Sequence, residues 1–205
     1  MPESRNSGLL ALGGIALAAL LAVVGHLGVD GLDPWSLTIS DYAVSDRGGA
    51  IDTAMMVLAV ATAVLLPALR RLWRARPVEM LLAAWIGGLL LAAAVPTNEP
   101  GLPMDTAAYV HRYASVIAFL ALPLGGWLLA DRLPAGPARW VRRFAVASLV
   151  LAAAMIWSAY PGDRMLLGLV ERLLIVAEVA ILATVAVALT AVTPVRAASA
   201  AGPPR

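Results

Sequence analysis

Six long apolar segments constrain the fold of this chain more than any other feature. A membrane-spanning helix needs about 20 mostly apolar residues, and because the bilayer interior cannot satisfy backbone polar groups, each such segment must be helical. We therefore expect an all-α integral membrane protein, a six-transmembrane-helix bundle with spans at about residues 8–28, 50–69, 79–96, 108–130, 144–161 and 167–192. The expected organisation is a short cytoplasmic N-terminus (1–7), a transmembrane domain (8–192) and a disordered cytoplasmic tail (193–205).

Composition supports this class. The chain is 61% hydrophobic and 14% charged, whereas a soluble domain is about 45–50% apolar and about 25% charged. The absence of cysteine excludes disulfides, thiolate nucleophiles and Cys-ligated metal sites. The basic residues form no stripe with interleaved aromatics, so nucleic acid is not an expected partner. The first apolar run is too long for a signal peptide and reads as a retained span.

Arginines set the expected orientation. Both termini and the connectors after the second and fourth spans carry most of the Arg residues, and only Arg47, Arg112, Arg164 and Arg172 fall on the other side. Because cytoplasmic loops carry the basic excess, we expect both termini to be cytoplasmic in a multi-pass plasma-membrane protein. The connectors at about 29–49, 97–107 and 162–166 then face outward.

Polar residues recur at the outward ends of the predicted spans and predict a polar pocket there. The connector "SLTISDYAVSDRGG" contains two Ser-Asp pairs, Ser40-Asp41 and Ser45-Asp46. We expect Asp41 to meet Arg172 or Arg112, so that Arg172 bridges a carboxylate. The outer pocket candidates are Ser40, Asp41, Thr97, His111, Arg112, Ser115, Glu171 and Arg172.

Glu178 is the ninth pocket candidate and lies deeper. It follows the start of the sixth predicted span by about eleven residues, which at about 1.5 Å per residue places it near the bilayer midplane. A carboxylate there costs about 3 kcal/mol on insertion scales, so it should face the bundle and hold a partner or a proton. Glu171 precedes it by seven residues on the same stripe of the helix.

Metal, haem and hydrolase sites are alternatives to a plain binding pocket. His26 and His111 could ligate a cation with Asp41, or a haem, but no pair of ligands has metal spacing on one helix. We therefore expect no metal and no cofactor. Ser40 or Ser36 could form a hydrolase triad with His111 and Asp41, although no nucleophile-elbow motif supports it.

The order of four motifs resembles a known family. "TISDYAVSDRGG" leads into the second span, "AVPTNEPG" closes the third, "HRYASVIAFLALPLGGWLLADR" forms the fourth and "GLVERLLIVAEVAIL" opens the sixth. Over about residues 8 to 192 the chain resembles the bacterial membrane family catalogued as domain of unknown function 998. The resemblance implies a six-helix membrane protein without an established activity. Its recurring polar positions correspond to Ser40, Asp41, Thr97, His111, Glu171 and Arg172.

From these observations we expect an outward-facing pocket that binds a small molecule or a lipid headgroup, with the lipid bilayer as the other partner. One alternative is an integral membrane enzyme acting on a lipid or isoprenoid, with His111 and either Asp41 or Glu171 as acid and base. A second alternative is a small transporter or proton-coupled subunit that uses Glu178.

Overall fold

The computed structural model describes residues 2–27, 33–44, 49–99 and 102–191. Within these residues it contains helices and connecting segments but no strand. Six helices are long and apolar enough to cross a membrane, which confirms the predicted fold class. The helices are α1 (Pro2–Leu27), α2 (Ile39–Ala43), α3 (Gly49–Trp73), α4 (Arg76–Ala94), α5 (Thr106–Ala130), α6 (Ala135–Ala159) and α7 (Leu167–Thr190).

Three features differ from the sequence prediction. The helix α6 begins at Ala135, whereas its span was predicted from about residue 144. The helix α1 begins at Pro2, so the described part of the predicted N-terminal segment is helical, and Ser4 is buried against the bundle. The short helix α2 lies in a connector for which no helix was predicted. The predicted tail at 193–205 and the pair Ser45-Asp46 lie outside the described residues.

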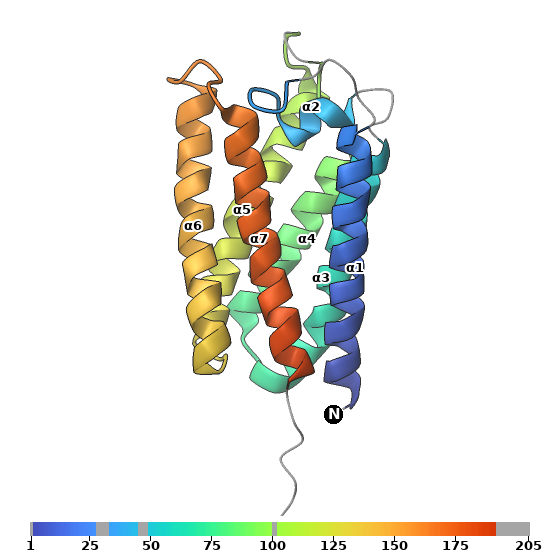
Figure 1. Cartoon of the computed structure of the whole chain (residues 1–205), viewed down its shortest axis with the longest axis vertical. Helices are drawn as coiled ribbons and strands as arrows, with labels where there is room; N and C mark the ends of the chain where they lie inside the picture. Colours follow the sequence, from blue (N-terminus) through green and yellow to red (C-terminus); the bar gives the residue numbers. More distant parts are fainter. Residues whose placement is uncertain (1, 28–32, 45–48, 100–101, 192–205) are drawn as a thin grey trace, which may run out of the picture.

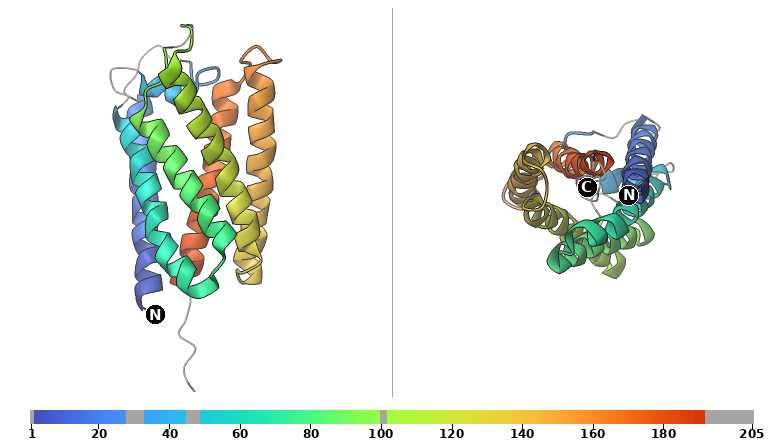
Figure 2. Two further views of the ribbon diagram at one scale, coloured as in Figure 1. Left: turned by 180° about the vertical axis from the view of Figure 1, so that it is seen from behind. Right: turned by 90° about the horizontal axis from the view of Figure 1, so that it is seen from below.

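The six long helices form a closed ring, seen from below in Figure 2. Each long helix packs against its neighbours in the chain, and α7 closes the ring against α1. The start of α1 and the end of α7 lie at one end of the bundle, which we call the termini end, and α2 covers the other, the α2 end (Figure 1). Towards the termini end the interior is filled by a hydrophobic core that includes Leu65, Leu69, Leu182 and Leu189.

Glycines mark the closest approaches between helices. A Cβ atom on Gly8 would lie 2.6 Å from the carbonyl oxygen of Ala186, and one on Gly14 would lie 2.7 Å from the Cβ of Ala61. Small residues let membrane helices pack closely in this way. Since Gly8 is near the start of α1 and Ala186 near the end of α7, these two helices touch at the termini end of the bundle.

Candidate functional site

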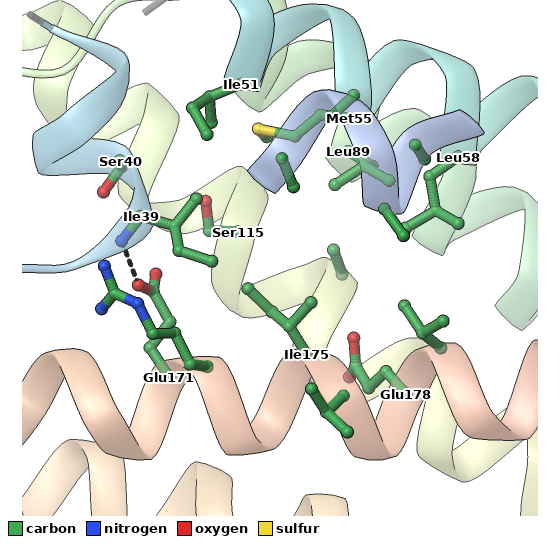
Figure 3. A pocket seen from close by; sticks show the side chains of 18 of the residues that line it. Ile39, Ser40, Ile51, Met55, Leu58, Leu89, Ser115, Glu171, Ile175 and Glu178 are labelled. Carbon is green, nitrogen blue, oxygen red and sulfur yellow. Dashed lines mark hydrogen bonds between the residues drawn. The ribbon is translucent and has the colours of Figure 1, made fainter. Parts of the chain in front are cut away.

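The half of the bundle nearer α2 contains a cavity of about 510 Å³. Five of the six long helices contribute to its wall, and α2 contributes from above; α6 does not. Figure 3 shows Glu171, Ile175 and Glu178 projecting into it from α7, with Ile39 and Ser40 on α2 and Ile51, Met55 and Leu58 on α3. Most of the wall is aliphatic, so the site is less polar than the sequence prediction of a polar pocket.

The cavity reaches the outer surface of the bundle between α1 and α7. Its wall includes Val23 and Leu27 of α1 and Val176 of α7, and these side chains are 53%, 80% and 65% exposed. The two helices touch near Gly8 at the termini end and leave this opening nearer α2. In a bilayer the opening would face lipid, because α1 and α7 are both candidate spans.

The sequence Thr-Ile-Ser-Asp folds as the first turn of α2. The amide of Thr38 donates to the Asp41 carboxylate at 2.7 Å, and the amide of Asp41 donates to the Thr38 hydroxyl at 3.2 Å. This reciprocal arrangement is a capping box. Arg164 also donates to Asp41, at 3.0 Å. The expectation that Asp41 meets Arg172 or Arg112 is therefore wrong, because its carboxylate is committed to the start of α2 and to Arg164.

Arg172 fastens the segment before α2 to the start of α7. One guanidinium nitrogen shares its two N–H groups among the carbonyl oxygens of Pro34 at 2.9 Å, Leu37 at 2.8 Å and Gly168 at 2.9 Å. The other nitrogen lies 3.0 Å from Nε2 of His26. The prediction that Arg172 bridges a carboxylate is not met among the described residues, because backbone carbonyls and a histidine occupy its donors.

His26 and Tyr42 belong to this cluster, although sequence reasoning did not place them in the pocket. The His26 ring stacks on Tyr42 at 4.8 Å between centroids, and Arg172 lies 5.1 Å over the Tyr42 ring. Nδ1 of His26 lies 2.7 Å from the carbonyl oxygen of Ala22, to which it must donate, so Nε2 accepts from Arg172. Both ring nitrogens are thus used within the protein. The only sequence signal was the position of His26 at the outward end of the first span.

The two glutamates of α7 have different surroundings. Glu171 is 5% exposed and accepts a hydrogen bond from the amide of Ile39, drawn as a dashed line in Figure 3. Glu178 is 3% exposed. One of its oxygens lies 3.5 Å from Nε1 of Trp85, and Oε1 has no hydrogen-bond partner among the described residues.

His111 and Ser115 of α5 also line the cavity. Nδ1 of His111 is 2.9 Å from the carbonyl oxygen of Val95, to which it donates. A neutral ring then carries no proton on Nε2. The hydroxyl of Ser115 donates to the carbonyl oxygen of His111 at 3.0 Å.

The serines do not form the hydrolase triad that was considered. The Ser40 hydroxyl lies 3.0 Å from that of Thr38, and the Ser36 hydroxyl donates to Asp33 at 2.6 Å. Asp41 binds Arg164 and the α2 amides rather than His111. A Ser40 or Ser36 triad is therefore not assembled in this structure.

Besides Asp41, which does not line the cavity, two predicted pocket residues lie away from it. Arg112 is exposed on α5, and Thr97 is half-buried in the segment after α4. Neither contributes to the cavity wall. Among the residues that the structure describes, no group of three or more His, Asp or Glu side chains could hold a metal ion.

Outside the spans, Asp33 organises the segment that Arg172 holds. Its carboxylate accepts from the Ser36 hydroxyl and from the Trp35 amide. These two hydrogen bonds hold the pKa of Asp33 below its usual value. The segment 33–38 is therefore fixed by its own carboxylate on one side and by Arg172 on the other.

Comparison with known proteins gives a family but no characterised relative. No curated protein and no solved structure matches this chain. The model of the family described as "Protein of unknown function (DUF998)" matches residues 12–188, and the chain therefore belongs to this family of proteins of unknown function.

Proposed function

We propose that this multi-pass membrane protein binds an amphiphilic, lipid-like molecule that enters its cavity sideways from the bilayer. The observation that carries the proposal is the opening between α1 and α7, where exposed aliphatic side chains lead into a cavity of about 510 Å³. Ligand sites typically have volumes of about 300–1,000 Å³ and mostly apolar walls with a few placed polar groups. An apolar chain fits such a wall, and a polar group of the ligand would meet the glutamates or His111.

The expected topology supports this proposal. In the structure Arg70, Arg71, Arg132 and Arg142 lie at the termini end, with further arginines nearby. The positive-inside rule then places the termini end in the cytoplasm and the cavity in the outward half of the protein. On this proposal the ligand comes from the outer leaflet of the plasma membrane.

Photocrosslinking in vesicles tests the proposal. A hexadecanol carrying a diazirine is added, and crosslinked positions are mapped by mass spectrometry. We expect adducts on the facing sides of α1, α3 and α7, and their loss in Ala22→Trp, because Ala22 lines the cavity. The matched control is Ala16→Trp, since Ala16 is exposed on the same helix and outside the cavity wall. Adducts confined to the outer faces of the bundle, unchanged by Ala22→Trp, would overturn the proposal.

The enzyme alternative has less support. General acid–base catalysis needs a base within about 2.6–3.2 Å of the proton that it takes. In this structure the two carboxylates considered with His111 have other partners: Asp41 binds Arg164 and the Thr38 amide, and Glu171 accepts from the Ile39 amide. Nε2 of His111 has no hydrogen-bond partner among the described residues, so His111 serves the binding proposal equally well.

A further inference from the structure

Glu178 is a buried carboxyl group whose hydrogen bonding is incomplete among the described residues. It is 3% exposed and lines the cavity, and its Oε1 atom has no hydrogen-bond partner among the described residues. Its other oxygen is at the outer limit of hydrogen bonding, 3.5 Å from Trp85. Buried polar groups in native structures are generally paired, and one that is not requires an explanation.

The charged and titratable groups near Glu178 do not provide a hydrogen-bond partner for its Oε1 atom. Arg172 precedes it by six residues, which is about 9 Å along the helix axis, and its guanidinium is bound to backbone carbonyls and to His26 at the α2 end. His111 is held by the carbonyl oxygen of Val95 at the same end. Glu171 differs from Glu178 because the Ile39 amide occupies one of its oxygens.

The position of Glu178 relative to the opening indicates how a ligand would lie. Val176 and Val179 lie close to it in the sequence of α7, and both belong to the cavity wall. Val176 also stands at the exposed edge between α1 and α7. A molecule with its polar group on Glu178 could therefore extend its apolar chain through the opening into the surrounding lipid.

We propose that Glu178 is the recognition group for a lipophilic amine, whose ammonium group binds Oε1 while its apolar chain occupies the cavity and the α1–α7 opening. This inference rests on the proposed function and specifies its ligand class. An ammonium group would supply a positive charge opposite the carboxylate and hydrogen-bond donors for its Oε1 atom. Hydrogen bonds between ionised partners are the stronger kind. An amine is accordingly preferred over an alcohol or a carboxylic acid of the same chain length.

A competition experiment tests the inference. Dodecylamine, dodecanol and dodecanoic acid each compete with the diazirine-bearing hexadecanol for the cavity. We expect dodecylamine to displace the photoprobe from the wild-type protein at a concentration about tenfold or more below that of dodecanol. Glu178→Gln should abolish this preference. The matched control is Glu99→Gln, which changes an exposed glutamate outside the cavity wall and should keep it.

A second measurement uses the unmodified protein. Dicyclohexylcarbodiimide is an apolar reagent that adds to carboxyl groups, and its adduct on Glu178 can be located by mass spectrometry. Dodecylamine should protect Glu178 from this reagent, and dodecanol at the same concentration should not. This result does not depend on the folding of any variant.

The outcomes separate the two proposals. Equal competition by all three probes, or an amine preference that survives Glu178→Gln, would overturn the role of Glu178 and leave the lateral binding site standing. Absence of cavity crosslinks and of competition by any probe would overturn both. Unchanged labelling of Glu178 in the presence of dodecylamine would count against the inference in the same way.

Discussion

Replacing Arg172 with alanine tests whether this side chain holds the α2 end together. The guanidinium donates to the half-buried carbonyl of Leu37, to the more exposed carbonyl of Pro34 and to His26. A hydrogen bond to a charged group contributes about 1.5–3 kcal/mol, and water can replace the one at Pro34. We therefore expect Arg172→Ala to lower the free energy of unfolding by about 2–4 kcal/mol. The control is Arg112→Ala, an exposed arginine expected to stay within about 0.5 kcal/mol of the wild type.

The free energies can be measured by circular dichroism during titration with SDS in mixed micelles. Because His26 and Arg172 are direct partners, the double variant His26→Ala and Arg172→Ala should lose less than the sum of the single variants. A loss no larger than that of Arg112→Ala, or strict additivity with His26→Ala, would refute the assignment of Arg172 to this cluster.

Three further predictions concern topology, helix packing and pH. Since the chain contains no cysteine, single cysteines introduced at Met104 and Gly136 should report opposite sides of the membrane. If an impermeant outside reagent labelled only the cysteine at Gly136, the expected topology would be wrong. Gly8→Ala should destabilise the protein by about 1–3 kcal/mol through overpacking against α7, whereas Gly13→Ala, with nothing within 4 Å, should not; equal SDS unfolding of both would contradict this. Because the pKa of Asp33 is lowered in the folded state, its contribution to stability should be present above its usual value of 3.8 and lost as the pH falls through the folded pKa. Asp33→Asn should therefore be destabilising at pH 7 and neutral in strongly acidic buffer, and a difference that persists in acid would contradict the assignment.

The six spans could be predicted because bilayer thickness sets the length of an apolar helix. The short helix α2 could not be found by the same argument. Its five residues are stabilised by the capping box of Thr38 and Asp41 and by Arg164 from a distant connector. The Thr-x-x-Asp spacing was a local signal for this helix, but hydropathy alone does not detect it.

The sequence predicted at which end of the bundle the site lies, but not which of its charged residues pair with one another. The sequence placed Asp41, Arg164 and Arg172 on the same side of the membrane, and the structure brings them to the same end. Which carboxylate meets which arginine depends on where each helix starts and how the segment 33–38 crosses α7. That geometry follows from tertiary contacts, so Asp41 was assigned to the wrong arginine.

The opening and the apolar wall of the cavity were harder to predict from the sequence than its polar residues. The cavity exists because α1 and α7 touch at Gly8 and leave an opening near Val23 and Val176. Its wall is made of the same Ala, Ile, Leu and Val residues that fill the core elsewhere. Glu178 marked the deeper part of this region in the sequence, because a carboxyl group in an apolar span is rare and marks a function. The part nearer α2 was marked by five other pocket candidates that line the cavity, Ser40, His111, Ser115, Glu171 and Arg172.

The hydrophobic core beyond Glu178 bears on the transporter alternative. A transport path would have to continue from Glu178 to the termini end, where Leu65, Leu182 and Leu189 are each 2% exposed or less. The two threonines on that part of α7 are bonded to their own helix, Thr184 to the carbonyl oxygen of Ala180 and Thr190 to that of Val187. On α7, therefore, these side chains do not extend a polar path from the cavity towards the termini end. On the proposed function, Glu178 would stand at the inner end of a site that opens to lipid, as expected of a recognition group for a membrane-dissolved ligand.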